Sequence, residues 1–189
     1  MIKKFIPSII ENTIYDIDFK AIYDSGKRFI LCDLDNTLIP YDMSLADETL
    51  KAKLADIQNI GLNIIIVSNN HKARVRSFSN DLGLVSFYSA LKPLSSGLRK
   101  ALKYIKKTYY KDEKIKDIKK CVITLGDQLM TDVFASSRLK LDSILVRPIK
   151  KKSEKWYTRF NRRMEKMVLK RMSKKYPEIY EEINEKHEY

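Results

Sequence analysis

The sequence lacks several features that would place it in a specialised class of protein. It has no run of about 18 apolar residues, which excludes a transmembrane helix. Its two cysteines, Cys32 and Cys121, lie in apolar segments and are expected to be buried reduced thiols. It has no internal repeat and no low-complexity linker. Pro7 and Glu11 interrupt the basic, then apolar N-terminus before a signal-peptide core could form, so we expect a cytoplasmic protein.

What is present is a globular composition with an uneven charge. The 189 residues are 44% hydrophobic, which suits one well-buried domain. The net charge is +13. Residues 150–175 contain twelve Lys or Arg against two Glu, whereas residues 176–189 contain five Glu against one Lys. A strongly basic segment is therefore followed by a short acidic tail.

Strand-like and helix-like segments alternate along residues 28–146, after an expected helical extension over 8–25. Strands are expected at 28–34, 62–68, 85–88, 120–125 and 143–146, and helices at 44–59 (capped by Ser44), 71–81, 95–109 and 130–138, with a charged loop before Lys120. This alternation predicts an α/β fold with a parallel sheet of about five strands between two helix layers. We expect one domain over 1–149, with residues 150–189 docked on it as a basic helix and acidic tail.

The most informative motif follows the first of these strands. The apolar run 29–32 leads into Asp33-Leu34-Asp35-Asn36-Thr37. Carboxylates at the carboxyl end of a buried parallel strand lie where open α/β sheets bind ligands, and they are costly unless a cation or substrate uses them. Because a strand alternates its faces, Asp33 and Asp35 can address one ligand only if the chain turns there or one acts through its backbone. The alternative is a turn that caps the next helix.

Three further polar motifs follow later strands in a fixed order. These are Ser68-Asn69-Asn70, then Lys92-Pro93, then the segment from Gly126-Asp127 to Asp132. Taken singly, Lys92 would be a surface lysine, Asp127 a helix cap and Asp132 an exposed helix residue. The series from Asp33 to Asp132 resembles the haloacid dehalogenase (HAD) superfamily of phosphatases, and it implies a HAD-like three-layer α/β/α fold.

The resemblance implies a role for each motif in phosphoryl transfer. Asp33 would be the nucleophile, Asp35 the general acid and base, and Lys92 the cation that neutralises charge. The phosphate oxygens would be held by Thr37, which also steadies its loop, by Ser68 and by the backbone N–H of Asn69.

The resemblance also implies a magnesium site. Mg²⁺ prefers hard oxygen ligands and few protein carboxylates. Asp33, Asp127 and the backbone carbonyl of Asp35 fit this preference. Asp132 would bind the metal through water or orient Lys92.

The spacing of the motifs bears on the size of the substrate. The intervals 37–68 and 68–92 leave no room for a cap domain of the kind that many HAD enzymes insert. An uncapped site stays open to solvent, which favours a phosphate carried by a protein, a nucleic acid end or a lipid headgroup.

The basic segment predicts an amphipathic helix. Its expected apolar stripe comprises Trp156, Phe160, Met164, Met167, Val168 and Met172. The stripe can pack on the domain; the helix can also lie on an anionic membrane surface or, less favourably, bind nucleic acid.

The whole chain resembles a narrower family, the YqeG-type phosphatases of HAD subfamily IIIA, which are related to the mitochondrial phosphatidylglycerophosphatase. The resemblance includes Asp16-Ile17-Asp18 and extends through Trp156-Tyr157-Thr158-Arg159-Phe160-Asn161-Arg162. It implies a magnesium-dependent phosphomonoester hydrolase, with phosphatidylglycerophosphate as the best specific substrate and a peripheral position at the inner membrane face. The alternatives are a phosphatase for nucleotides or nucleic acid ends, and a nucleic-acid- or ribosome-interacting protein on a HAD scaffold. The oligomeric state stays open.

Overall fold

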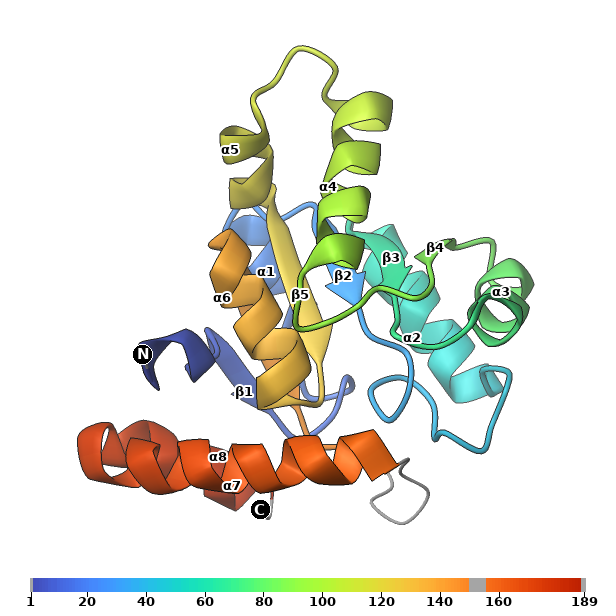
Figure 1. The fold of residues 1–189 in the computed structure, drawn as a ribbon. Coiled ribbons are helices and arrows are strands. Elements are labelled where there is room, and N and C mark those ends of the chain that lie inside the picture. Colours follow the sequence, from blue (N-terminus) through green and yellow to red (C-terminus); the bar gives the residue numbers. More distant parts are fainter. Residues whose placement is uncertain (1, 150–155, 188–189) are drawn as a thin grey trace.

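A parallel sheet forms the centre of the molecule (Figure 1). The computed structural model describes residues 2–149 and 156–187, without the side chains of residues 156–162. The strand order is β1-β6-β5-β2-β3-β4, and every pairing between neighbours is parallel. The strands are β1 (Ile9–Glu11), β2 (Phe29–Cys32), β3 (Asn63–Val67), β4 (Val85–Phe87), β5 (Val122–Gly126) and β6 (Asp142–Val146).

Helices cover both faces of the sheet and make the fold three-layered. They are α1 (Phe19–Asp24), α2 (Glu48–Asn59), α3 (Lys72–Asp81), α4 (Ser96–Tyr109), α5 (Ile115–Ile118), α6 (Phe134–Leu139), α7 (Trp156–Lys175) and α8 (Pro177–His187), with short turns η1 (Ile2–Phe5), η2 (Lys119–Cys121) and π-helical η3 (Leu129–Val133). Helices α1, α2 and α3 share one apolar core with the sheet, and α4, α5 and α6 share another. The expected α/β fold is confirmed.

Strand β2 shows why the sequence produces this arrangement. All four of its residues are buried, as expected for a central strand covered on both faces. Ile30 and Cys32 point into the core under α2, whereas Phe29 and Leu31 point into the core under α4. This alternation follows from the two-residue period of a strand.

The strand order places a crevice at the end of β2. From β2 the chain continues through β3 and β4 to one side, and later through β5 and β6 to the other. Ligands bind open α/β sheets at such a topological switch point, outside the carboxyl ends of the strands. Asp33 directly follows β2 and therefore stands at this crevice.

The N-terminal segment differs from the sequence prediction. Residues 8–25 are not one helical extension: Ile9–Glu11 forms β1, which pairs with β6 and makes a sixth strand. Ile10 is buried, so the short strand covers an edge of β6 that would otherwise be open. Only α1 is helical here, and Asp18 caps it by accepting a hydrogen bond from the backbone N–H of Ala21.

Two further boundaries were wrong. Helix α2 begins at Glu48, and its cap is Asp47 rather than Ser44, because the Asp47 carboxylate accepts the backbone N–H of Leu50. The expected charged loop before Lys120 contains the short helix α5. Helix α5 has four residues, of which Ile118 is buried, and a segment of this length is too short for a helical apolar period to show in the sequence.

The C-terminal helices pack on the sheet edge near η1 and η3. Val168, Leu169 and Met172 of α7 are buried there together with Ile183 of α8. The acidic tail is largely helical, since α8 spans Pro177–His187. The expected stripe is wrong at Met167, which is 50% exposed, while Trp156 and Phe160 lie outside the described side chains. Within the described residues, no helix is long and apolar enough to cross a membrane.

Candidate active site

The segments that follow three strands place the Lys92 ammonium between the carboxylates of Asp33 and Asp132. The Nζ atom of Lys92 lies 2.6 Å from Oδ1 of Asp33 and 2.6 Å from Oδ1 of Asp132. Asp33 follows β2, Lys92 lies on the loop after β4, and Asp132 lies in η3 after β5. The Lys92 side chain is only 4% exposed, so these charge-assisted hydrogen bonds are shielded from water.

Burial sets the protonation of this cluster. It raises the pKa of Asp33 to about 7; the Lys92 ammonium opposes the rise and the Asp132 carboxylate adds to it. For Lys92, burial alone would lower the pKa, but the carboxylates of Asp132 and Asp33 outweigh it and raise the pKa above its ordinary value. One lysine therefore does not fully compensate the carboxylates, and a further cation would favour the ionised form of Asp33.

A group of three carboxylates could bind that cation. One oxygen from each of Asp33, Asp127 and Asp132 lies within 4.8 Å of the others. Asp127 is fully buried, and the Thr37 hydroxyl donates to its Oδ1 atom over 3.4 Å. Hard oxygen donors of this kind suit Mg²⁺. The Asp35 side chain does not belong to this group.

Gly126 allows the group to be this compact. A Cβ atom at position 126 would lie 2.3 Å from Cγ of Asp132 and 2.5 Å from its Cβ. No side chain fits there unless Asp132 moves, so the glycine is required by the close approach of the carboxylate.

Asp35 faces a different set of partners from Asp33. Its Oδ1 accepts from Nε of Arg74 over 2.6 Å, and its Oδ2 accepts from Nδ2 of Asn70 over 3.0 Å and from the Ser68 hydroxyl over 3.5 Å. The chain turns directly afterwards, where Asn36 has a φ of 61°. The two carboxylates thus stand at one crevice while their oxygens point to different neighbours.

Arg74 and Asn70 are site residues that the sequence analysis missed. Arg74 also donates to the carbonyl of Pro40, and its guanidinium lies 5.1 Å from the centre of the Tyr41 ring. It thereby ties α3 to the loop between β2 and α2. Asn70 precedes the N-cap of α3, His71, whereas Arg74 lies in the first turn of the helix, so no helical period connects the two residues; the available signal was only the place of Asn70 in the motif at 68–70.

The Asn69 side chain holds the lysine loop. Its Oδ1 accepts from the backbone N–H of Lys92 over 2.7 Å, and its Nδ2 donates to the Lys92 carbonyl over 3.1 Å. This pair fixes the backbone at Lys92. Asn69 therefore positions the lysine, a role different from the phosphate contact expected of it, which concerned its backbone N–H. The buried Ser68 hydroxyl in turn accepts from the backbone N–H of Asn70 over 3.1 Å.

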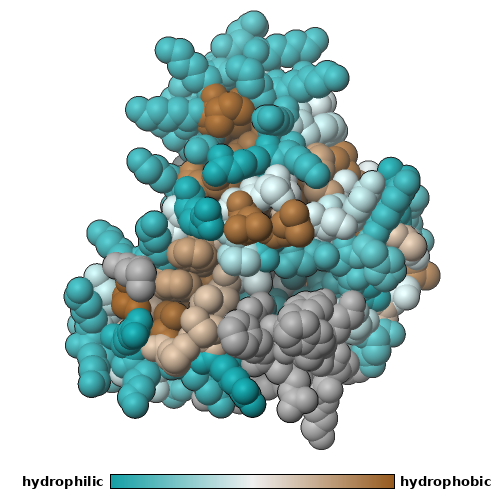
Figure 2. Space-filling model, viewed as in Figure 1, coloured by the Kyte–Doolittle hydropathy of each residue, from teal (hydrophilic) through white to brown (hydrophobic). Residues whose placement is uncertain are grey.

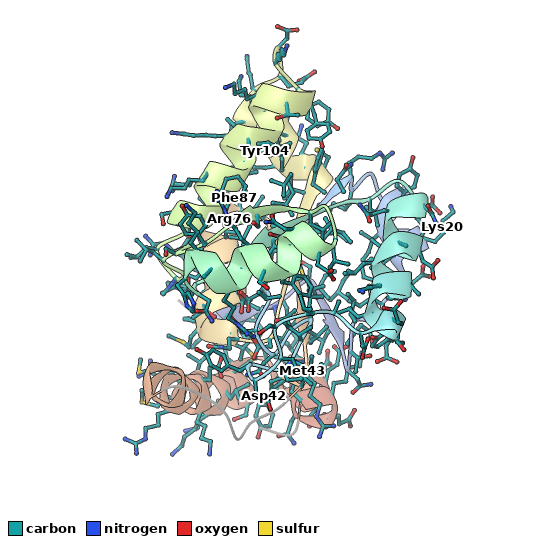
Figure 3. The ribbon with its side chains drawn as sticks, turned by 90° about the vertical axis from the view of Figure 1, so that its right-hand side faces the viewer. Lys20, Asp42, Met43, Arg76, Phe87 and Tyr104 are labelled. Atoms are coloured by element: carbon teal, nitrogen blue, oxygen red, sulfur yellow. The ribbon has the colours of Figure 1, made fainter. Side chains whose placement is uncertain are left out.

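A cavity of about 520 Å³ lies beside the site. It is bounded by the end of β1, the loop between β2 and α2, and the chain after β6, with Tyr15, Met43 and Arg147 in its walls. Thr37 is the one candidate catalytic or phosphate-binding residue that lines it. Figure 3 shows Asp42 and Met43 on this loop, at the end of the molecule that carries the C-terminal helices.

Comparison with known proteins identifies relatives. Residues 2–150 match the family described as "Mitochondrial PGP phosphatase". The chain is 33% identical over 178 residues to "Probable phosphatase YqeG" of Bacillus subtilis, and the match covers 93% of this chain and 96% of that protein. A solved structure of a hypothetical protein from Xanthomonas campestris is similar with a TM-score of 0.47 and 15% identity, over 72% of this chain and 73% of the other. The resemblance found in the sequence is confirmed, and the chain belongs to the YqeG-type phosphatases of the HAD superfamily.

Proposed function

We propose that this phosphatase hydrolyses a phosphomonoester through an aspartyl-phosphate on Asp33, with Mg²⁺ as cofactor. The observation that supports it most strongly is the buried cluster of Asp33, Lys92, Asp127 and Asp132 at the switch point. A nucleophile, a fixed cation and a group of hard oxygen ligands meet there, which are the parts that phosphoryl transfer requires.

In the proposed reaction Asp33 is the nucleophile and Asp35 is the general acid and base. A carboxylate oxygen of Asp33 bonds to phosphorus while the bond from phosphorus to the alcohol oxygen breaks. Asp35 gives its proton to that oxygen, then accepts a proton from the water that releases inorganic phosphate from Asp33. Since the Asp35 carboxylate accepts hydrogen bonds from Arg74 and Asn70, proton delivery to the substrate requires the carboxyl group to turn away from at least one of them.

The metal and the lysine have separate places in this proposal. Carboxylate oxygens of Asp33 and Asp127 and the backbone carbonyl of Asp35 would hold Mg²⁺, which supplies positive charge to the phosphate oxygens. Asp132 has an oxygen 2.6 Å from Nζ of Lys92, which supports its role in orienting the lysine. Thr37, Ser68 and the backbone N–H of Asn69 are proposed to hold the phosphate.

The proposed substrate is phosphatidylglycerophosphate, with the protein acting from the cytoplasm at a membrane surface. The description of the matching family supports this substrate. Between β2 and β3 the chain forms only a loop and α2, and between β3 and β4 only a loop and α3, so no cap domain closes the site against a phosphate held in a bilayer. The cavity beside Thr37 offers room for the alcohol half of the substrate.

The test is phosphate release from phosphatidylglycerophosphate in mixed micelles, with and without Mg²⁺, compared with a generic aryl phosphate. We expect magnesium-dependent release from both. Release from the aryl phosphate alone would retain the phosphatase and reject the lipid, and competition by polynucleotide would then favour the nucleic-acid-end alternative. Release that persists in excess chelator would reject the metal.

The close approach at Gly126 makes a prediction about the metal. Because the new Cβ in Gly126→Ala must displace Asp132, we expect magnesium affinity to fall about 10- to 100-fold, as for changes that disturb metal ligands and their supports. Isothermal titration with Mg²⁺ measures this, and Asp132→Asn, which keeps the space open, separates crowding from charge. Unchanged affinity in Gly126→Ala would contradict the proposed metal group.

The contacts of Asn69 make a prediction about Lys92. In Asn69→Ala both hydrogen bonds to the Lys92 backbone are lost, so the lysine is held less firmly and kcat should fall about tenfold while magnesium affinity is retained. Steady-state kinetics on an aryl phosphate measure kcat. Asn80→Ala, at an exposed asparagine in the last turn of α3, is the matched control and should leave kcat unchanged.

A further inference from the structure

The loop that carries Lys92 also displays two leucines. Leu91 is 59% exposed and Leu94 is 60% exposed, although Lys92 between them is buried. Figure 2 shows an apolar patch surrounded by hydrophilic side chains at the foot of α4, where this loop turns. Large aliphatic side chains beside a catalytic group are costly to leave in water, which marks the loop as an interaction surface.

Hydrogen bonds fix the backbone of the loop around Lys92, so the leucines belong to an ordered segment. Ala90 is buried; its N–H donates to the Ser68 carbonyl over 3.0 Å, and its carbonyl accepts from the N–H of Gly97 over 2.8 Å. The Ser95 hydroxyl donates to the carbonyl of Ala135 over 3.0 Å. These bonds connect the loop to β3, α4 and α6.

Its backbone adopts an uncommon conformation at three positions. Ser89, Leu91 and Ser95 have φ angles of 46°, 52° and 64°. Non-glycine residues seldom adopt this left-handed region, and leucine has no polar side chain to compensate for it. In this loop Lys92 is buried while Leu91 and Leu94 face solvent, and a leucine held in a left-handed conformation and left exposed suggests a functional reason for its position.

The chain segment around the leucines and the helix that follows them are positively charged. Residues 82–111 contain seven Lys or Arg and no Asp or Glu. Five of these lie on α4: Arg99 and Lys100 are near its start and the loop, whereas Lys103, Lys106 and Lys107 lie further along, where they line an open hollow with Lys111. Arg138 reaches the carbonyl of Pro93 from α6 over 3.5 Å.

A second arginine lies near the strand end that leads into the loop. The guanidinium of Arg76 lies 5.9 Å from the centre of the Tyr88 ring. Figure 3 shows Arg76 of α3 near Phe87 of β4, on the side of the molecule opposite Lys20. An aliphatic tip within a basic rim complements a bilayer that contains anionic lipids.

We propose that Leu91 and Leu94 insert into an anionic bilayer, with basic residues of α4, Arg76 and Arg138 near the headgroups, so that the loop that carries Lys92 lies at the membrane surface. The inference rests on the proposed lipid substrate and adds the surface by which the enzyme reaches it. Aliphatic tips favour lipid over nucleic acid, since single-stranded nucleic acids stack their bases on aromatic side chains.

The experiment measures sedimentation of the full chain with vesicles of phosphatidylcholine mixed with phosphatidylglycerol, without substrate. The variant is Leu91→Asn combined with Leu94→Gln; asparagine tolerates the left-handed backbone at 91, so the fold should persist, as circular dichroism can check. We expect the partition coefficient to fall about tenfold in the double variant. Vesicles of phosphatidylcholine alone should bind the wild type several-fold more weakly.

The control is Met167→Ser, which removes an apolar side chain that is 50% exposed from the basic helix α7. It should leave the partition coefficient unchanged. Loss of binding in Met167→Ser but not in the double variant would assign docking to α7 and overturn the inference. Equal binding of all three proteins, or binding of RNA but not of vesicles, would also overturn it.

These outcomes are separate from those of the substrate assay. Docking without hydrolysis of phosphatidylglycerophosphate would reject the proposed substrate and retain the surface. Hydrolysis in mixed micelles by a wild-type protein that does not bind vesicles would retain the substrate and reject the surface.

Discussion

Replacing Asp33 by asparagine is expected to lower kcat about 10⁴-fold or more while the protein stays folded. The amide has the shape of the carboxyl group but does not attack phosphorus, so the covalent route is lost. Binding of a phosphomonoester should survive, because Lys92 keeps its contact with Asp132. Steady-state and single-turnover kinetics on an aryl phosphate measure the loss.

The same variant should be more stable than the wild type in chelator at about pH 8. Burial raises the pKa of Asp33 from its ordinary value of 3.8 to about 7 in the folded protein, so between these values the folded protein binds more protons than the unfolded chain. Stability therefore falls as the pH rises from about 4 to about 7, and the full penalty applies above about 7. Asparagine carries no such penalty, and saturating Mg²⁺ should remove it from the wild type.

Thermal unfolding at several pH values checks this second effect. The difference in Tm between Asp33→Asn and the wild type should shrink as the pH falls from about 8 to about 5. Asp112→Asn, at an exposed acid before α5, is the control and should show neither effect. Full activity in Asp33→Asn would contradict the proposed nucleophile, and equal Tm values at every pH would contradict the buried, incompletely compensated carboxylate.

The sequence predicted the candidate site better than the contacts within it. Asp33, Lys92, Asp127 and Asp132 are separated by up to 99 positions, yet a parallel sheet brings the ends of its strands to one edge, and the resemblance to the HAD phosphatases selected these four residues near those ends. The partners of Asp35 did not follow. The turn at Asn36 decides whether the Asp35 carboxyl group faces the other carboxylates or Arg74. The only sequence signal for this turn is the asparagine itself.

The prediction of the fold succeeded for segments with a strong apolar pattern and failed for the very short segment at the N-terminus. Strand β2 and helix α4 have strong patterns and appear where expected. The three residues of β1 show no period, and their pairing with β6 joins positions 135 residues apart, which local sequence does not encode. The acidic tail was given no fold because its charge dominates, although Ile183 is fully buried in α8.

Replacing Lys92 by alanine is expected to damage both catalysis and stability. Without the ammonium, Asp33 and Asp132 face each other in a buried site, and removing one partner of a buried ion pair costs about 3–5 kcal/mol. The cost should be larger at about pH 8 than at about pH 5, because protonation of Asp33 relieves the repulsion at the lower pH. Loss of a fixed charge on the transferring phosphate should lower kcat about 10³-fold.

Two comparisons identify the charge as the cause. Lys92→Met keeps most of the side-chain volume, so it should lose nearly as much activity as Lys92→Ala, whereas Lys116→Ala, at an exposed lysine of α5, should change neither quantity. Urea unfolding with and without Mg²⁺ adds the decisive measurement. If the metal binds beside Asp33, it supplies part of the missing charge, so Mg²⁺ should stabilise Lys92→Ala more than it stabilises the wild type. Equal stabilisation of the two proteins would place the metal away from the lysine and would contradict a shared site.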